Sequence, residues 1–490
     1  MHRLIFYAFL AFLVGCSGQQ NKQNTDFNAP LKPEAQWHAG DHHVHSRFSV
    51  GWDREKEPPE PIIGGDAIYP IPMNALMSRH HGLSWMVTTD HGGPGHSKVT
   101  QDWAYPALLR SRKVLPEVLQ YHGLELNSPG ADHATLIVPK GPNEATQLFR
   151  YESAYDRNEI WPQDGSRDDP SLMLAALEEM GAAELPPIVI ANHPSRSGTS
   201  SKRYGRYEPA ELRAWNDAAP NVAVGFAGAP GHQAVTLAPN GDVIPDRPRG
   251  AFVGQPTMGG FDPMTSRLGG LWDALLAEGR RWWITANSDS HIHYTEGGSD
   301  FWPGEYSKTW VYAAFDYNEL LDAVRSGRIF VATGDLVTGL ALTLTVDGAA
   351  REIWPGDTVK LREGTEFSLS ITLTDPETSN AAGRQPSLSR LDVIIGDISG
   401  PAQNQDNDHN PTTRVASRIH RAEMMEGGER LTARWESAAR SDQYIRLRGT
   451  NTTELEPLQD PMGENPWDDL WFYSNPIFIE VEKSTATEEQ

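Results

Sequence analysis

Two hydrophobic periodicities divide the 490-residue sequence near Asp335. Between Trp37 and Asp335, short apolar runs alternate with helix-like segments, a pattern typical of an α/β domain with parallel strands. After Asp335, apolar residues recur with a period of two between clusters of Gly, Pro, Asp and Asn, which predicts an antiparallel β-sandwich. We therefore expect two folded domains, over residues 37–335 and 336–490.

Each predicted domain has a definite set of elements. In the first domain, the pattern predicts strands at 85–89, 118–126, 133–138, 188–191, 222–226 and 282–286, and helices at 171–180, 209–215, 268–278 and 317–325. In the second domain, it predicts strands at 340–346, 367–373, 391–395, 431–435, 444–447 and 477–481.

The N-terminal residues resemble a bacterial lipoprotein signal. A basic start precedes an apolar run from Leu4 to Val14, which is shorter than the roughly 20 residues that span a bilayer. The run closes on Leu-Val-Gly-Cys16, similar to a lipobox, which implies a signal peptide over residues 1–15 and lipid on Cys16. The alternative is an ordinary signal peptide with an unrelated cysteine. Ser17 favours the outer membrane, and residues 16–36 are expected to form a flexible tether.

Composition excludes several classes of function. The chain has 42 Lys and Arg against 65 Asp and Glu, a formal charge of −23, which argues against a nucleic-acid-binding surface. Its single cysteine excludes an internal disulfide and a thiolate metal site. No segment after the N-terminal run is long and apolar enough to span a bilayer. We therefore expect the protein to be attached to the membrane only through its lipid anchor.

Imidazoles and carboxylates recur where predicted strands end. The sequence has 17 histidines, and 14 of them lie between His38 and His293. They fall in repeated short motifs: Asp41-His-His43-Val-His45, Thr89-Asp90-His91, Glu125 with His133, Asn192-His193-Pro194, and Asp289-Ser-His291. One histidine beside an apolar run is usually structural. Five strand ends that each carry histidine or carboxylate side chains predict a shared site.

This set of side chains has the chemistry of a metal centre. Residues i and i+2 of a strand point to one face, so His43 and His45 can approach a common point. In a parallel barrel, the strand ends gather on one rim. His, Asp and Glu without sulfur suit Zn²⁺, Mn²⁺ or Fe²⁺, and a bridging carboxylate allows two ions about 3.5–4 Å apart.

The ordered motifs resemble the polymerase-and-histidinol-phosphatase (PHP) family over residues 37–332. The resemblance implies a distorted (β/α)7 barrel that carries two or three divalent ions. It implies that the first ion is held by His43, His45, Glu125 and Asp289, that Glu125 bridges to a second ion held by His133 and His193, and that His91 and His291 hold a third. The chain departs from the family at Ser49-Val-Gly51, where an Asp or His is usual; Asp53 is the nearest carboxylate.

A second, looser resemblance concerns the tail. Tyr444-Ile-Arg-Leu-Arg-Gly449 and Ser474-Asn-Pro-Ile477 look like the carbaryl-hydrolase branch of the same family, which also joins the barrel to a β-rich tail.

Other residues are expected to support the chemistry. His91 or His291 is a candidate to protonate the leaving oxygen. Asp90 is expected to orient a ligating histidine, with a solvated loop acid as the alternative. Arg196 is placed to meet an anionic oxygen, with a surface salt bridge as the alternative. We expect Arg203 and Tyr204 to contact substrate, and the loop 406–409 to be solvated.

The sequence thus predicts a metal-dependent hydrolase in which metal-activated hydroxide attacks a small-molecule ester. A phosphoesterase acting on a small organic phosphate is the first candidate. A carboxylic or carbamic ester hydrolase with the same centre is the second. The third is a cell-surface binding protein whose barrel is inactive and whose sandwich binds a glycan or protein. A fold alone does not choose between them.

Overall fold

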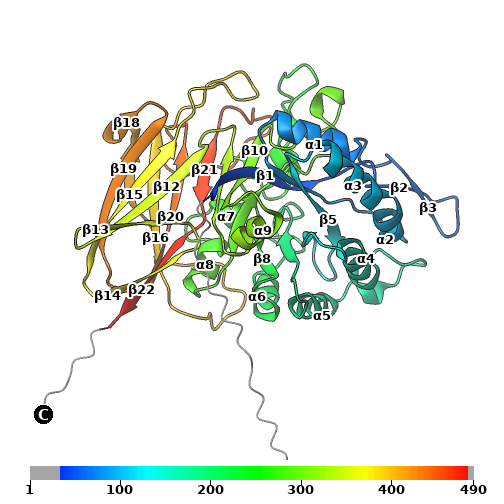
Figure 1. Ribbon diagram of the computed structural model, residues 1–490, viewed down its shortest axis with the longest axis horizontal. Coiled ribbons are helices and arrows are strands. Elements are labelled where there is room, and N and C mark those ends of the chain that lie inside the picture. The colour runs from blue at the N-terminus through cyan, green and yellow to red at the C-terminus, as the bar shows by residue number, and fades with distance from the viewer. Residues whose placement is uncertain (1–33, 484–490) are drawn as a thin grey trace, which may run out of the picture.

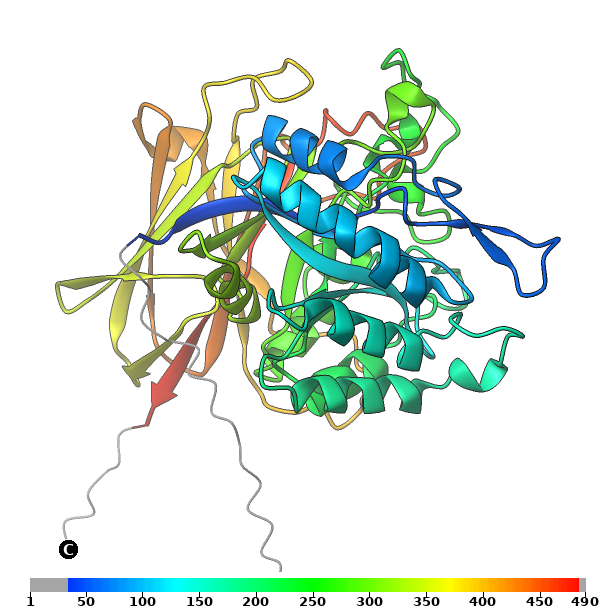
Figure 2. The ribbon, with the colours of Figure 1, turned by 45° about the vertical axis from the view of Figure 1, so that its right-hand side comes forward.

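The computed structural model describes residues 34–483, which form a mixed α/β molecule with one large mixed sheet and separate antiparallel sheets (Figure 1). Helices cover the part of the large sheet that comes from the first half of the chain, and strands dominate the opposite side (Figure 2). The α-helices are α1 (Ile71–His80), α2 (His96–Val99), α3 (Tyr105–Val114), α4 (Glu144–Tyr155), α5 (Pro170–Gly181), α6 (Pro209–Ala218), α7 (Pro263–Ser266), α8 (Leu271–Ala277) and α9 (Tyr317–Arg325).

The large sheet has 15 strands and runs through both halves of the molecule. Its order is β14-β22-β20-β21-β11-β10-β1-β4-β5-β6-β7-β8-β9, and β16 and β17 are attached through β20. The strands are β1 (Gln36–Val44), β4 (Trp85–Thr88), β5 (Leu119–Asn127), β6 (His133–Val138), β7 (Ile188–Ala191), β8 (Ala223–Ala229), β9 (Trp283–Ala286), β10 (Ser307–Ala313), β11 (Ile329–Thr333), β14 (Thr358–Arg362), β16 (Arg390–Asp397), β17 (Arg414–His420), β20 (Gln443–Thr450), β21 (Trp471–Ser474) and β22 (Ile477–Glu482).

Two smaller sheets are antiparallel. The five-stranded sheet has the order β13-β12-β15-β19-β18, and a hairpin of β2 and β3 projects from the helix-covered side. Their strands are β2 (Gly51–Asp53), β3 (Glu60–Ile62), β12 (Gly339–Val346), β13 (Ala349–Ile353), β15 (Glu366–Thr374), β18 (Met425–Gly427) and β19 (Arg430–Ala438).

Local sequence signals account for several helices. Asp169 caps α5 by accepting a hydrogen bond from the Ser171 backbone N–H, and Pro170 occupies the first helical position. Asp316 caps α9 in the same way, and the buried residues of α9 lie on one face of the helix. The predicted helix at 317–325 and the strands at 133–138 and 188–191 are confirmed with their exact bounds.

The prediction of parallel strands in the first domain is wrong at β6, and also at β10, which is antiparallel to β1 and β11. β1, β4 and β5 are parallel, as are β7, β8 and β9, but β6 is antiparallel to both β5 and β7. The reason is the short loop after β5: a five-residue connection from Asn127 to His133 can only turn the chain back beside the same strand. In the tail, β14 and β22 are likewise parallel.

The end of β9 lies beside the end of β1. The backbone N–H of Asp289 donates to the carbonyl of His43 over 3.1 Å, and that of His45 donates to the carbonyl of Ser290 over 3.1 Å. These bonds bring the first and last histidine motifs together, although they are some 245 residues apart.

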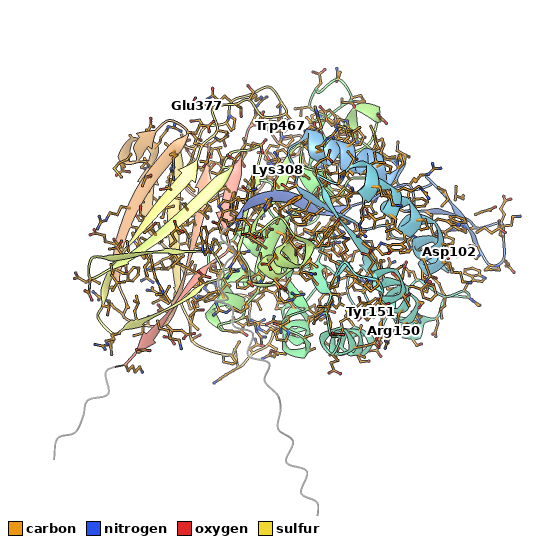
Figure 3. All side chains as sticks on the ribbon, viewed as in Figure 1. Asp102, Arg150, Tyr151, Lys308, Glu377 and Trp467 are labelled. Carbon is orange, nitrogen blue, oxygen red and sulfur yellow. The ribbon has the colours of Figure 1, made fainter. Side chains whose placement is uncertain are left out.

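The strand-rich and helix-rich parts share the large sheet and an apolar core. β11 pairs with β21 of the tail, and Phe330 and Tyr306 pack in one cluster with Phe472 and Trp467. Trp467 and Lys308 lie where the two parts meet (Figure 3). The domain boundary near Asp335 stays a prediction, since strands from both sides of it belong to one sheet.

The loop 406–409, which the sequence predicts to be solvated, exposes Asp406 and His409 but is also anchored to the first half of the chain. The carbonyls of Gln405 and Asn407 accept hydrogen bonds from Arg213, and His409 Nδ1 lies 2.8 Å from the Gly269 carbonyl. The loop therefore docks on α6 and on the segment before α8, where polar backbone groups replace apolar contacts.

The predicted signal peptide and the lipidation site Cys16 lie outside the described residues. Within residues 34–483, no helix combines the length and the apolar character needed to cross a membrane.

Candidate metal centre

Four side chains predicted for the first ion meet at one buried point. His43 and His45 leave the end of β1, Glu125 lies in β5, and Asp289 follows β9. His43 Nε2 lies 2.9 Å from His45 Nε2, 3.2 Å from Glu125 Oε1 and 3.2 Å from Asp289 Oδ1. His45 Nε2 lies 3.2 Å from Asp289 Oδ1, and all four side chains are buried.

The residues predicted for the second ion approach the same Glu125 oxygen that His43 approaches, while His45 Nε2 lies 3.5 Å from Glu125 Oε2. Glu125 Oε1 lies 3.2 Å from His133 Nδ1 and 3.3 Å from His193 Nε2. His193 follows β7 with a positive φ of 29°, an uncommon conformation that turns its ring toward β5. Glu125 is therefore shared between two groups, as a bridging carboxylate would be.

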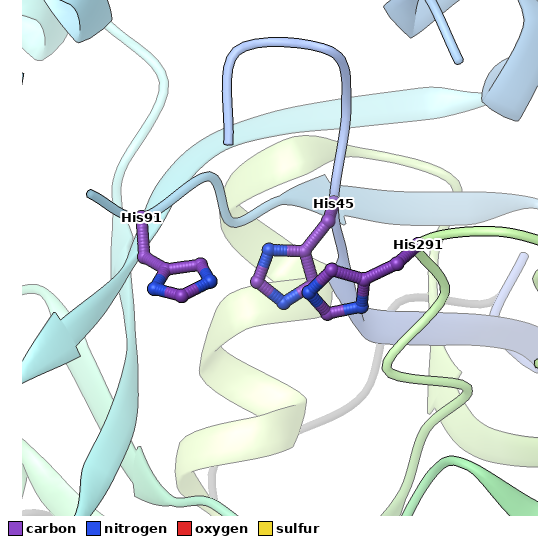
Figure 4. A group of neighbouring side chains, drawn as sticks. All are labelled: His45, His91 and His291. Carbon is purple, nitrogen blue, oxygen red and sulfur yellow. The ribbon is translucent and has the colours of Figure 1, made fainter. Parts of the chain in front are cut away.

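The third group is at the edge of the same site. His45, His91 and His291 come from separate loops, and their rings face one another (Figure 4). The rings of His45 and His291 stack at 3.8 Å between centroids. These three residues offer nitrogen atoms within 4.8 Å of one another.

Asp66, and not Asp53, supplies the carboxylate beside His91 and His291. Asp66 Oδ2 lies 3.1 Å from His91 Nε2 and 3.4 Å from His291 Nε2. Asp53 is in the β2–β3 hairpin, and its carboxylate accepts a hydrogen bond from the Glu55 backbone instead. The hairpin inserts residues between the turn after His45 and the loop that carries Asp66, which is why proximity in sequence was misleading.

His232 and Asp300 are further members of the site that sequence reasoning missed. His232 Nε2 lies 3.1 Å from Asp289 Oδ2, and its Nδ1 lies 2.5 Å from Asp300 Oδ1. His232 follows β8 just as His193 follows β7, so the rule of histidines at strand ends would have found it. Asp300 also accepts hydrogen bonds from the backbone of His291 and Ile292, which fixes that loop.

The two central carboxylates are held ionised. Burial alone would raise the pKa of Glu125, but the charges of His133 and His43 outweigh it and hold that pKa well below its usual range. For Asp289, burial is outweighed in the same way by His232 and His43, so its pKa is also well below the usual range.

The imidazoles are divided in charge. Burial, with the charge of His291, holds the pKa of His45 well below its usual value, and burial with Arg196 lowers that of His193 to about 4. For His291, burial is outweighed by the hydrogen bond to Asp66 and by Asp289, which raises its pKa to about 9. Neutral imidazoles and ionised carboxylates are the forms that ligate metals, so His45 and His193 favour the ligating form, whereas His291 would have to release a proton when an ion binds.

These residues fit divalent cations. Two ring nitrogens only 2.9 Å apart, with a carboxylate oxygen 3.2 Å from each, form a donor set directed at one point. Asp289 Oδ1 is buried, faces both of these ring nitrogens and has no other hydrogen-bond partner among the described residues. Several His, Asp and Glu groups here can thus hold metal ions.

Asp90 orients a histidine through an intermediate serine, not directly. Its carboxylate accepts hydrogen bonds from the backbone and hydroxyl of Ser46 over 2.5 and 2.7 Å and from the Ser49 hydroxyl over 3.2 Å. Ser49 Oγ in turn lies 2.8 Å from His45 Nδ1. Asp41 holds the neighbouring backbone, accepting from the N–H groups of His43 and Ser288.

Arg196 lies against the centre and is paired with residues of the ligand groups. Its guanidinium donates to Asp289 Oδ2 over 2.8 Å, and its Nη2 lies 2.6 Å from His193 Nε2. The predicted substrate contacts Arg203 and Tyr204 instead bind Asp408 of the docked loop, over 2.6 and 2.9 Å. A carboxylate from the distant tail occupies these two side chains, which no local sequence pattern reveals.

Three histidines near the motifs lie outside the ligand groups. His42 Nε2 lies 2.8 Å from the Thr285 hydroxyl, and burial lowers the pKa of His42 to about 3. His96 Nδ1 contacts Glu152 at 2.5 Å, and His293 Nε2 contacts Glu305 at 2.9 Å. These residues hold the loops around the centre.

No protein-family model matches the chain, and no curated protein matches it. Among solved structures, PsfC from Pseudomonas syringae is similar over 56% of this chain and 82% of its own, with 14% sequence identity and a TM-score of 0.28. A likeness at this level carries no argument about function.

Proposed function

We propose that this protein is a metal-dependent hydrolase of small-molecule esters, with a phosphoester as the first candidate substrate. The observation that carries the proposal is the convergence of His43, His45, Glu125 and Asp289 within 4.8 Å of one another at a buried point. Glu125 and the neighbouring groups extend this point into a site for two or three ions of zinc, manganese or iron.

The chain's own residues have distinct tasks in this proposal. Divalent ions bound there would lower the pKa of water and polarise the ester oxygen. His91 or His291, at the half-open edge of the site, is placed to give a proton to the leaving oxygen when it is not engaged by a third ion. Arg196 holds Asp289 and His193 in place and offers its guanidinium to an anionic oxygen.

The proposal includes the fold family and location that the sequence suggests. We propose that residues 37–335 form a distorted PHP-type barrel and residues 336–490 a β-sandwich-like domain, as in the carbaryl-hydrolase branch. The order of the motifs supports this assignment. Through lipid on Cys16, the protein would be anchored to the bacterial cell envelope.

A carboxylic or carbamic ester is the second candidate substrate. The observation that favours it is the pairing of Arg196 with Asp289 and His193, because a paired guanidinium is less available to a phosphate dianion. The two candidates therefore differ in whether substrate displaces Arg196 from these partners.

Parallel assays decide between the candidates. The full chain is tested on nitrophenyl phosphate and nitrophenyl acetate with added Mn²⁺ or Zn²⁺, beside His43→Ala and the control His38→Ala. His38 is buried on the same strand but lies outside the metal groups. We expect phosphate hydrolysis that His43→Ala abolishes and His38→Ala retains. Hydrolysis of the acetate alone would select the second candidate, and hydrolysis of neither would favour a binding protein.

A further inference from the structure

A cavity of about 330 Å³ lies beside the backbone segment that follows His91. Its wall includes Gly92 and Gly93, the two residues that follow His91. Because consecutive Cα atoms are about 3.8 Å apart, this wall begins within about 8 Å of the His91 backbone. Asn127, next to the Glu125 strand end, donates from its side chain to the Gly92 carbonyl over 3.2 Å and fixes the wall to the centre.

The cavity has two indole faces. Trp52 comes from the β2–β3 hairpin and Trp161 from the loop after α4. A Cβ atom on Gly93 would lie 3.2 Å from Trp52 Nε1, so glycine is what lets the indole pack against this backbone. Trp161 is 46% exposed, although an indole is normally largely buried. Pro59 and Pro94 complete the apolar part of the lining.

The rim of the cavity is polar. Arg54, Asn158 and Gln163 line it, and within residues 34–483 none of their side chains is hydrogen-bonded or ion-paired to another residue. A carboxamide offers both donors and acceptors, and a guanidinium offers five donors. Arg54 and Gln163 are exposed, so water satisfies them in the free protein. A ring that carries hydroxyls can replace this water and also pack on an indole, whereas an unsubstituted aryl ring can only pack.

We propose that this cavity, named here the ring subsite, binds a hexopyranose ring that forms the alcohol part of the substrate. One C–H face of the sugar lies on Trp52 or Trp161, and its hydroxyls bond to Asn158, Gln163 and Arg54. The part of this inference that concerns catalysis rests on the proposed function. The ester bond then lies toward His91, and the preferred substrate is a sugar phosphate or the corresponding sugar ester.

Binding of the sugar is tested without any catalysis. Saturation-transfer NMR of the full chain is recorded with the methyl glycosides of glucose, galactose, mannose and N-acetylglucosamine, and with phenol. We expect saturation of the ring protons of at least one glycoside, lost in Trp161→Ala and reduced in Asn158→Ala. Phe315→Ala is the matched control, since Phe315 is 45% exposed but lies outside the ring subsite and outside the neighbouring cavity that shares Trp161 with it. Loss of the signal in Phe315→Ala as well, or binding of phenol alone, would overturn the proposal.

Kinetics then separate this inference from the proposed function. With glucose 6-phosphate and ethyl phosphate as substrates, we expect Trp161→Ala to raise KM about tenfold for the sugar phosphate, with kcat kept and ethyl phosphate unaffected. An equal effect on both substrates would contradict a ring subsite. If neither phosphate is hydrolysed, the proposed function fails, while the NMR titration still decides whether the sugar binds.

Discussion

Asp66 is the residue whose role differs most from what its sequence neighbourhood indicates. It lies in a loop with no adjacent histidine, and its carboxylate reaches His91 and His291. Burial alone would raise the pKa of Asp66, but its hydrogen bonds to His291 and His91 outweigh burial and lower it. An ionised carboxylate between two imidazoles is a ligand set for a third ion.

We expect Asp66→Asn to remove one divalent ion per chain and to leave the ions at Glu125 in place. The amide keeps the size of the side chain but removes its charge. The group of His45, His91 and His291 then loses the carboxylate of Asp66. Titration of the metal-free protein with Mn²⁺ measures the stoichiometry. Asp53→Asn is the matched control and should bind as many ions as the wild type. Equal stoichiometry in the wild type and Asp66→Asn would show that Asp66 is not a ligand.

Ser49 connects Asp90 to the ring of His45. We expect Ser49→Ala to weaken binding of the first ion about 10- to 100-fold, because the ring loses the partner that fixes its orientation. Competition with a metal-binding dye measures the affinity. Ser46→Ala, which removes a hydroxyl that bonds to Asp90 but not to a ring, should change the affinity little. Similar losses in both variants would refute a specific role for Ser49.

The four central ligands were predictable from the sequence by two different signals. Glu125 closes the predicted strand at 118–126 and Asp289 follows the one at 282–286, whereas His43 and His45 were identified by their i, i+2 spacing, and the structure brings all four together. Asp66 and Asp300 could not be predicted, since they belong to loops whose paths depend on tertiary packing. The indirect action of Asp90 through Ser49 also depends on a turn geometry that the residue types alone do not define.

At the scale of elements, the sequence predicted 12 of the 22 described strands, and their directions only in part. The apolar runs at 118–126 and 133–138 correspond to β5 and β6, yet their antiparallel pairing depends on the length of the loop between them. β10 and β11 were missed although they join the two parts of the large sheet. The hydrophobic period indicates which residues of a strand are buried. Which strands pair with one another depends on contacts across the whole sheet.

The contact between α2 and α4 contains a buried ion pair with a pH-dependent contribution to stability. His96 Nδ1 lies 2.5 Å from Glu152 Oε1, and its Nε2 lies 2.8 Å from the Phe48 carbonyl. Burial, which would lower the pKa of His96, is outweighed by Glu152, and the pKa is raised to about 9. Because the folded pKa exceeds the unfolded one of 6.5, this contribution is complete below pH 6.5 and is lost as the pH rises to about 9.

We expect the free energy of unfolding of the wild type to fall between pH 6.5 and pH 9 by up to about 3 kcal/mol from this group. In His96→Gln, which keeps a donor of similar length but does not titrate, the fall should be smaller and the stability at pH 6.5 lower. Urea unfolding at several pH values measures both. Parallel pH profiles in the two proteins would show that the His96–Glu152 pair does not contribute in this way.

At the scale of the whole molecule, buried charges join the helix-covered part to the tail. Arg446 of β20 donates to both carboxylate oxygens of Asp273 in α8, over 2.9 and 2.8 Å, and Tyr444 donates to the same carboxylate. Both Arg446 and Asp273 are buried. Together with the shared sheet, this pair predicts that the two parts unfold in one transition.

Replacing Arg446 with Met should destabilise the protein by about 3–5 kcal/mol, because Asp273 is left as an uncompensated buried charge. We expect coincident transitions in near-UV circular dichroism and tryptophan fluorescence for the wild type and the variant. Arg434→Met is the control, as Arg434 is exposed on β19 and should cost little. Two separated transitions, with only one shifted by Arg446→Met, would indicate independent domains.

Metal content is the most direct test of the central claim that the histidine and carboxylate groups form one metal centre. Elemental analysis of natively purified full-length protein should find two or three divalent ions per chain. His38→Ala should keep them, and His43→Ala and Asp289→Asn should each lose the ion that those side chains share. A wild-type protein without bound divalent metal, or a His43→Ala variant with undiminished content, would contradict the account.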